Sequence, residues 1–193
     1  MYLVDNEGWL RDSCDGDSIC YRASPNCNQR PSAAAVDLLV IHNTSLPSGQ
    51  FGGGHIEALF CNCLDCESDP VFADLLGLEV SAHLLIDRAG AITQFVSLYD
   101  RAWHAGVSCF EGRSNCNDFS IGIELEGTDT QPYTDAQYEQ LARVTRALCD
   151  HFPALSPERI VGHSDIAPSR KTDPGPAFDW VRYRQQLHDL NNN

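Results

Sequence analysis

Two histidines, together with two aspartates that follow the second of them, are the residues of this chain whose types and spacing could hold a metal ion. His42 and His163 each end a short apolar run and precede a loop that contains proline. Two imidazoles and one carboxylate, with an open position for water, are common ligands of a catalytic zinc ion. If the two apolar runs form neighbouring strands, both imidazoles reach the same edge of one sheet. The sequence therefore predicts a metal centre at that edge.

Two residues after His163 compete for the place of the carboxylate ligand. Asp165 lies two residues further on and could equally orient the imidazole of His163 from outside the ligand shell. Asp173 lies beyond a loop and directly before the Pro-Gly-Pro run 174–176, where the prolines restrict the backbone. The stiffer backbone favours Asp173, and the residue types alone leave the choice open.

Further charged groups could take part in chemistry at such a centre. Lys171 is the only lysine of the chain, and a compact ammonium can stabilise the oxyanion that develops on a polarised amide carbonyl. In the run 118–127 a period of two places Glu124 and Glu126 on one face and three aliphatic residues on the other. Carboxylates on an inner strand face are costly unless they are paired or used. One of the two glutamates is therefore a candidate proton acceptor.

The chain supplies the apolar runs needed to position these residues. Short runs rich in β-forming residues predict strands, and two adjoining runs predict a β-hairpin. Apolar residues at helical spacing predict helices, of which the longest begins with Thr134 and Gln137 as a capping box. In the last helix we expect Phe178, Val181 and Leu187 to form the buried face. The predicted strands are 36–42, 82–97 (the hairpin), 118–127 and 159–163, and the predicted helices are 55–62, 134–152 and 177–190.

Length and composition limit the classes of protein. At 193 residues and 42% hydrophobic composition we expect one domain over 1–193, with an irregular lead-in over 1–35. Strands mixed with helices predict an α+β fold, in which helices cover a central mixed sheet. A net charge of −14 opposes binding to nucleic acid or to an anionic membrane. Neither an apolar run of about 20 residues nor a basic leader is visible, which predicts a cytoplasmic protein.

Nine cysteines are present, and their odd number together with the missing export signal predicts reduced thiols. Cys61, Cys63 and Cys66 stand close enough in sequence to share a soft metal ion. They lack a fourth ligand and the usual paired spacing of structural zinc sites. A second metal site is therefore not expected.

Several long segments resemble one family, the cytoplasmic 1,6-anhydro-N-acetylmuramoyl-L-alanine amidases (AmpD), within the wider group of zinc amidases and peptidoglycan recognition proteins. The resemblance runs from about Gly8 to Trp180, which is nearly the whole chain. It implies an amidase fold with a central mixed sheet flanked by helices. The segments that carry it are HNTSLPSGQFGG, VSAHLLID, RAWHAGVS, CNDFSIGIELEGTD, YTDAQYEQLARVTRAL and GHSDIAPSRKTDPGPAFDW.

The resemblance also assigns roles to single residues. It implies one zinc ion per chain, with Asp173 rather than Asp165 as its carboxylate ligand, and Glu124 rather than Glu126 as the general base. Two neutral imidazoles and one carboxylate leave a net charge of +1 on such a centre, and the cation of Lys171 would restore polarisation of the substrate carbonyl. For Trp103 a place in the core is the alternative to substrate contact. The implied zinc ligands are His42, His163 and Asp173, the catalytic residues Glu124 and Lys171, and the substrate contacts Asn43, Trp103, His104 and Arg170.

The implied activity is hydrolysis of the amide bond between the lactyl group of (1,6-anhydro-)N-acetylmuramic acid and L-alanine, in peptidoglycan turnover and recycling. The expected partner is a small muropeptide, bound by a monomer without nucleic acid or membrane. The alternative is a non-catalytic muropeptide-binding module, and the filled ligand positions favour the hydrolase. The chain departs from the family pattern at Glu79 and Asn115, where the pattern has arginine, which puts the preference for the stem peptide in doubt.

Overall fold

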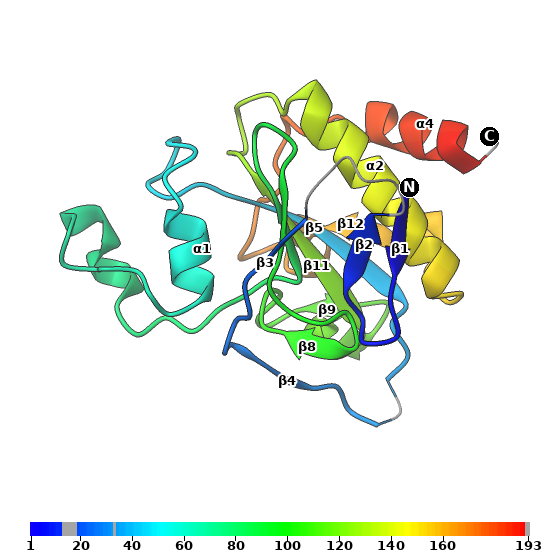
Figure 1. Cartoon of the computed structure of the whole chain (residues 1–193), viewed down its shortest axis with the longest axis horizontal. Helices are drawn as coiled ribbons and strands as arrows, with labels where there is room; N and C mark the ends of the chain where they lie inside the picture. Colours follow the sequence, from blue (N-terminus) through cyan, green and yellow to red (C-terminus); the bar gives the residue numbers. More distant parts are fainter. Residues whose placement is uncertain (13–18, 33, 192–193) are drawn as a thin grey trace.

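The computed structural model describes residues 1–12, 19–32 and 34–191 and is built on a six-stranded mixed sheet (Figure 1). The first four strands run parallel to one another, the fifth is antiparallel to the fourth, and the last is parallel to the fifth. The predicted strands, the predicted hairpin and the α+β class are confirmed. In sheet order the strands are β12 (Ile160–Gly162), β5 (Leu38–Thr44), β11 (Ser120–Glu126), β6 (Leu84–Ile86), β7 (Ile92–Gln94) and β3 (Cys20–Tyr21).

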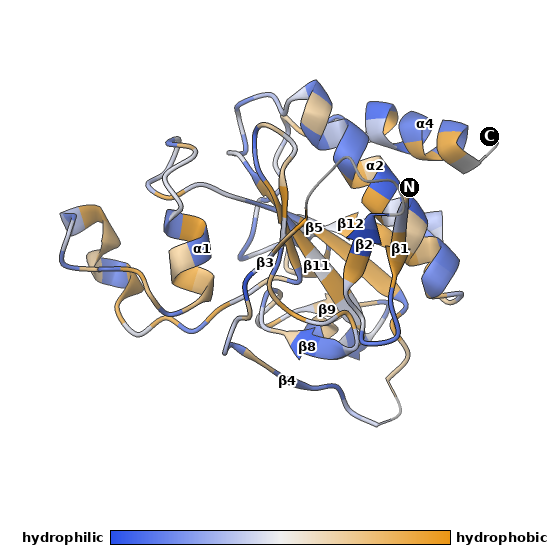
Figure 2. Ribbon diagram, in the orientation of Figure 1, coloured by the Kyte–Doolittle hydropathy of each residue, from blue (hydrophilic) through white to orange (hydrophobic). Residues whose placement is uncertain are grey.

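The centre of the sheet is buried on both faces. In β5 the first five residues are buried, and β11 is buried except at Glu124. Figure 2 shows these central strands as largely hydrophobic, which is typical of parallel strands covered on both sides. β5 and β11 pair over seven positions, and this register places Glu124 opposite His42.

One face of the sheet is covered by α2 (Asp135–His151), α4 (Trp180–Asn191) and the hairpin of β1 (Tyr2–Val4) and β2 (Leu10–Asp12) (Figure 1). Helix α2 begins as predicted, because Thr134 accepts a hydrogen bond from the amide of Gln137 while Gln137 accepts one from the amide of Thr134. The aliphatic face of β11 packs into the same core as the buried side chains of α2. This layer holds β11 so that its glutamates face the opposite side.

The buried face of the last helix differs from the prediction. Val181 is 81% exposed, whereas Tyr183 is fully buried and bonds through its hydroxyl to Thr145 of α2. Phe178 and Leu187 are buried as expected, but Phe178 lies before the helix, which begins at Trp180 rather than at 177. The helix begins at residue 180 and directs Tyr183 towards α2, so position 181, two residues earlier, points away from α2.

The other face of the sheet carries shorter elements and two smaller hydrophobic clusters. Helix α1 packs against β6 and the segment after β7, as part of an arm that projects to the left in Figure 1. Most elements on this side are two to six residues long, so the loops between them are exposed over long stretches. The 3₁₀ helix η3 (Pro157–Arg159) leads into β12. The short elements are α1 (His55–Phe60), α3 (His163–Ile166), the 3₁₀ helices η1 (Pro70–Leu75) and η2 (Cys116–Asp118), and the strands β8 (Asp100–Ala102), β9 (Cys109–Phe110) and β10 (Arg113–Ser114).

The lead-in over 1–35 is more regular than predicted. It contributes β1, β2 and β3, and also β4 (Cys27–Gln29), which pairs antiparallel with β8. Strands of two or three residues are too short to show a period of two, which explains why the sequence did not reveal them. The part of the prediction that concerns 13–18 and 33, including Cys14, lies outside the described residues.

The cysteines of the described residues are free thiols. Between α1 and η1, the thiol of Cys63 donates to the carbonyl of Cys61 at 3.2 Å, and that of Cys66 to the carbonyl of Leu64 at 3.7 Å. Each thiol is thus engaged with its own loop. Within the described residues, none of the helices has the length and apolar character required to span a bilayer.

Candidate active site

The predicted metal ligands meet at the carboxyl ends of β5 and β12. His42 lies on β5, with Glu124 of β11 beside it in register, and His163 is the first residue after β12. Asp173 lies on the loop after α3, where its carbonyl accepts a hydrogen bond from the amide of Ser164 at 3.0 Å. That bond holds the loop against the start of α3. Four segments that are distant in the sequence therefore converge at one edge of the sheet.

Three atoms of this cluster face one another at close range. Nδ1 of His42 is 2.9 Å from Nδ1 of His163, and Oδ2 of Asp173 is 3.1 Å from each of them. Two neutral imidazole nitrogens cannot both donate to each other, so at least one lone pair points into the space that the three atoms enclose. Among the described residues this is the only group of three potential metal ligands that lie together. Two nitrogens and one carboxylate oxygen fit a bound divalent metal ion.

The protonation states in the cluster suit metal binding. Burial lowers the pKa of His42 to about 4, so its imidazole is neutral near pH 7. Burial opposes ionisation of Asp173, but its close contacts with His163 and His42 outweigh burial and hold the pKa of this carboxyl below its usual value. Nε2 of His163 lies 3.0 Å from the carbonyl of Ala105, and a proton on that nitrogen leaves Nδ1 free as a ligand. Metal ions require these deprotonated forms.

The structure places Asp165 and Asp173 differently. Asp165 is exposed, and its Oδ2 accepts a hydrogen bond from the amide of Gly162 at 2.7 Å, at the start of α3. Asp173 is the carboxylate that reaches both histidines. The stiff run after Asp173 thus brings this carboxylate to the two histidines, whereas Asp165 caps a short helix.

The two glutamates of β11 face the same side of the sheet but have different surroundings. Glu126 accepts hydrogen bonds from the amides of Gly52 at 2.6 Å and Arg88 at 3.2 Å, which ties two loops to the strand. Glu124 has a buried Oε2 without a hydrogen-bond partner among the described residues. Burial, with a further contribution from the charge of Asp173, raises the pKa of Glu124 well above its ordinary value. Glu124 is therefore the carboxylate available for proton transfer.

Lys171 lies close to this cluster on the loop that leads to Asp173. Its amide donates to the carbonyl of Ala167 at 2.9 Å, and its side chain is half-buried. Burial is the main influence on both the pKa of His42 and the pKa of Glu124, and the positive charge of Lys171 lowers both. A cation therefore stands within electrostatic reach of the ligand cluster and of the free carboxylate.

Comparison with known proteins agrees with this arrangement. Residues 32–176 match the family model described as N-acetylmuramoyl-L-alanine amidase. The 1,6-anhydro-N-acetylmuramyl-L-alanine amidase AmpD of Escherichia coli (strain K12) is 60% identical over 161 residues, which is 83% of this chain and 87% of the relative. The chain belongs to the N-acetylmuramoyl-L-alanine amidase family.

Solved structures of this amidase family share the fold. The crystal structure of a selenomethionine AmpD derivative superposes with a TM-score of 0.89 at 54% identity, and covers 96% of this chain and 99% of that one. The amidase AmiD of Escherichia coli, in complex with anhydro-N-acetylmuramic acid-L-Ala-D-γ-Glu-L-Lys, has a TM-score of 0.59 at 30% identity and covers 95% of this chain and 65% of that one. The AmpD fold therefore extends over almost the whole chain.

Two of the residues that the family resemblance implies as substrate contacts, Asn43 and Trp103, are partly exposed. Asn43 follows His42 on β5 and donates a hydrogen bond to Asp129 at 2.9 Å, at the wall of a polar hollow of about 460 Å³. Trp103 is half-buried and donates from its indole to Asn28 at 2.8 Å, so it is not a core aromatic. The hollow is lined by Asn43, Thr44, Ser45, Ser48, Gly127, Thr128, Asp129 and Thr130.

The other two residues of that set turn toward the protein. Arg170 donates through one nitrogen to the carbonyls of Ala105 at 2.6 Å and Val107 at 2.9 Å, which fixes the loop behind His163. His104 has one ring nitrogen 2.9 Å from Nε2 of His42 and the other 3.2 Å from the hydroxyl of Ser120. Both ring nitrogens of His104 are thus occupied by protein groups.

A row of histidine rings, which sequence reasoning missed, runs from the cluster of His42, His163 and Asp173 into the interior of this amidase. Its centroids are separated by 5.7, 5.0 and 4.4 Å, and it consists of His83, His104, His42 and His163. At its inner end Arg30 is half-buried and donates to backbone carbonyls, among them those of Asn117 at 3.0 Å and Ser120 at 2.9 Å. Arg30 lies in the lead-in without a periodic pattern around it, so nothing local marked it. The small residues Ser120 and Gly122 in the SIGI segment were the one sequence feature that could have pointed to this row, because both contact His104.

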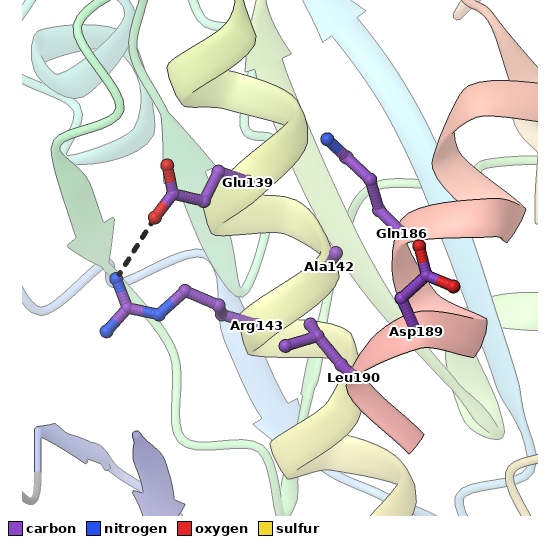
Figure 3. Close-up of a pocket in the computed structure, with 6 residues that line it drawn as sticks. All are labelled: Glu139, Ala142, Arg143, Gln186, Asp189 and Leu190. Carbon is purple, nitrogen blue, oxygen red and sulfur yellow. Dashed lines mark ion pairs between the residues drawn. The ribbon is translucent and has the colours of Figure 1, made fainter. Parts of the chain in front are cut away.

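A separate hollow of about 240 Å³ lies between α2 and α4 (Figure 3). It is lined by side chains of these two helices, including an ion pair of Glu139 and Arg143 at 4.0 Å across one helical turn. None of the residues implied for catalysis or binding contributes to it. This hollow is therefore separate from the residue cluster at the sheet edge.

Proposed function

We propose that this chain is a zinc-dependent amidase that cleaves the bond between the lactyl group of (1,6-anhydro-)N-acetylmuramic acid and L-alanine in muropeptides. The observation that carries the proposal is the convergence of two imidazole nitrogens and one carboxylate oxygen beside Glu124, whose buried Oε2 has no hydrogen-bond partner within the described residues. The names of the E. coli relative and of the substrate-bound AmiD structure support the substrate class.

One zinc ion per chain would be held by His42, His163 and Asp173. When bound, zinc acts as a Lewis acid on the scissile carbonyl and makes water more acidic. The chain's own part is to keep both imidazoles neutral, to keep the carboxylate ionised and to leave one side of the cluster accessible. Burial keeps the imidazole of His42 neutral, the pKa of Asp173 lies below its usual value, and the loop that carries Asp173 is half-exposed.

Glu124 would transfer the proton that the reaction has to move. It takes a proton from the attacking water and returns it to the nitrogen of L-alanine, so the C–N bond breaks with a neutral amine as the leaving group. A carboxylate with an ordinary pKa is a weak base and holds the proton poorly. The raised pKa of Glu124 suits both transfers.

Lys171 would stabilise the negative charge that develops on the carbonyl oxygen. The three ligands carry one negative charge, so a bound zinc centre keeps a net charge of +1 and polarises less than a site with three neutral histidines. A neighbouring ammonium adds to the field at the oxyanion. Its effect on the pKa values of His42 and Glu124 is consistent with such a position.

The wider expectations from the sequence remain part of the proposal. The amidase would act as a single-domain monomer on small fragments during peptidoglycan recycling in the cytoplasm, with Asn43 and Trp103 at the substrate. For Arg170 and His104 the protein contacts described above favour supporting roles.

Product analysis tests the proposal directly. Purified, zinc-loaded protein is incubated with anhydro-muropeptide and with intact sacculi, with and without a chelator, and the products are identified by mass spectrometry. We expect free stem peptide from the small substrate and its loss on chelation. Binding of anhydro-muropeptide without cleavage would support the alternative, a non-catalytic binding module, and would overturn the amidase.

A further inference from the structure

The donor and acceptor roles along the histidine row can be assigned from its contacts. A metal ion on Nδ1 of His42 requires that the proton of this imidazole lies on Nε2, which then donates to Nδ1 of His104 at 2.9 Å. His104 consequently carries its own proton on Nε2, which faces the hydroxyl of Ser120 at 3.2 Å. Ser120 in turn donates to the carbonyl of Cys116 at 2.6 Å. The chain of hydrogen bonds has one direction, from the ligand to a backbone carbonyl.

The protein is built to hold His104 in this place. Its ring lies against Gly122, where an added Cβ would come within 2.5 Å of the imidazole, so any larger residue would displace it. The side chain of Asn117 accepts hydrogen bonds from the amides of His104 at 3.1 Å and Ala105 at 2.7 Å. Ser120 is fully buried. Backbone and ring of His104 are therefore fixed independently of any substrate.

The far end of the hydrogen-bond chain is fixed as well. Arg30 donates to the carbonyls of Asn117 and Ser120, on either side of the turn that enters β11. This guanidinium comes from the lead-in, outside the segment that matches the family model. The acceptor carbonyl of Cys116 belongs to the same turn, because Cys116 begins η2.

We propose that Ser120 and His104 form a positioning relay that sets the tautomer and ring orientation of His42, and thereby its affinity for the metal. The relay rests on the proposed zinc site. His163 needs no relay, because its Nε2 faces the carbonyl of Ala105 directly. The two histidine ligands are thus oriented by different means, one by the backbone and one by two side chains. Outer partners of this kind commonly change metal affinity by 10- to 100-fold.

A matched pair of serine variants separates the relay from general support of the fold. Ser120→Ala removes the acceptor for His104, while the carbonyl of Cys116 keeps the amide of Phe119 as a donor. Ser108→Ala is the control, because Ser108 is also buried and its hydroxyl accepts from the amide of Cys116 at 3.1 Å without contact to the histidine row. Zinc dissociation constants are measured by competition with a chromophoric chelator. We expect Ser120→Ala to weaken zinc binding by about tenfold and Ser108→Ala to leave it unchanged.

A second pair tests the acceptor at His104 itself. His104→Asn keeps an oxygen near the position of Nδ1, whereas His104→Leu leaves the Nε2 proton of His42 without an acceptor. We expect the leucine variant to bind zinc roughly 10- to 100-fold more weakly and the asparagine variant to retain most of the affinity. In the zinc-loaded wild-type protein, long-range ¹H–¹⁵N NMR spectra should show His104 protonated on Nε2.

The outcomes distinguish the relay from the zinc site on which it rests. Failure of the wild-type protein to bind stoichiometric zinc would overturn the proposed metal. Stoichiometric zinc in the wild type, with equal affinities in Ser120→Ala and Ser108→Ala, would overturn the relay alone. Equal losses in both His104 variants, or a proton on Nδ1 of His104, would also overturn it.

Discussion

The front pair of the histidine row, His42 and His163, and the rear pair, His83 and His104, are packed ring to ring but differ in what their nitrogens face. In the front pair, one nitrogen of each ring points at the other ring and at Asp173. In the rear pair, His83 accepts from the amide of Gly122 at 3.0 Å and faces the carbonyl of Asp100 at 3.1 Å. His83 is as buried as the two front histidines, so burial does not mark a ligand. What distinguishes the proposed ligands is that their lone pairs converge on one point.

The same contrast separates the two glutamates of β11. Glu126 is satisfied by two backbone amides, and Glu124 keeps a buried oxygen without a partner in the part of the chain that the structure describes. Unsatisfied polar groups are rare in folded proteins because each one costs stability. We therefore expect substitutions at the front of the site to remove function, and substitutions behind it to remove stability or affinity.

The largest effect should come from loss of a front histidine. His163→Ala removes one of the three proposed metal ligands, and a metal ion contributes several kcal/mol to such a reaction, so activity should fall by roughly 10³-fold or more. Metal content, measured by atomic emission, should fall from about one per chain to near zero. Full metal content in this variant would contradict the assignment of His163 as a ligand.

Glu124→Gln should come next, with a loss of about 10³-fold in kcat at unchanged metal content, because an amide cannot carry the proton. Glu126→Gln is the matched control on the same strand face. It should lower the melting temperature more than Glu124→Gln does, since it weakens the bonds to the loop amides, and it should retain most of the activity. A reversed order of the two variants in activity would refute the distinction between the glutamates.

Lys171→Ala should reduce kcat by about 10²-fold, in the range found for loss of one donor to an oxyanion. Zinc content should stay near one per chain. Lys171→Arg keeps the charge and should recover part of the rate. If zinc content fell together with turnover, Lys171 would support the metal site rather than the oxyanion.

The smallest effect concerns His83 of the rear pair and is a change in how stability depends on pH. Burial lowers the pKa of His83 to about 3, whereas the unfolded chain takes up this proton below about pH 6.5. As the pH falls from 6.5 towards 3, the unfolded state gains a proton that the folded state does not, and the free energy of unfolding falls by up to about 1.4 kcal/mol per pH unit.

His83→Asn keeps an acceptor for the amide of Gly122 and removes this titration. Urea unfolding of chelator-treated protein at several values between pH 6 and 4 should therefore show a shallower loss of stability than in the wild type. The variant should also be less stable at pH 7, because the contact with Asp100 is lost. Parallel slopes for variant and wild type would show that His83 titrates normally in the folded protein.

Local patterns in the sequence were sufficient for the elements that carry the site. The apolar runs before His42 and His163, the period of two around Glu124 and the capping box of α2 each depend on neighbours within a few residues. The choice of Asp173 over Asp165 needed the family resemblance, because both are short carboxylates near one histidine. Their roles differ through the path of the loop between them.

Interactions between distant segments were beyond such patterns. The position of the His104 ring depends on its contact with the hydroxyl of Ser120 and on the absence of a side chain at Gly122. Val181 was misplaced because the start of α4 is set by packing, in which Trp180 and Tyr183 contact Phe178. The charge of Arg30 is satisfied by carbonyls of remote turns rather than by an acidic residue nearby in the sequence.

The location of His42 on the second strand of the sheet couples the metal to the folding of the chain. His163 and Asp173 are ten residues apart and could meet early, but His42 joins them only when β5 has entered between β12 and β11. The proposed zinc ion thus binds the assembled sheet and not the unfolded chain. Free zinc at a hundred times its dissociation constant would add about 2.7 kcal/mol to the free energy of unfolding. The lifetime of this enzyme against proteolysis would consequently follow the supply of its metal.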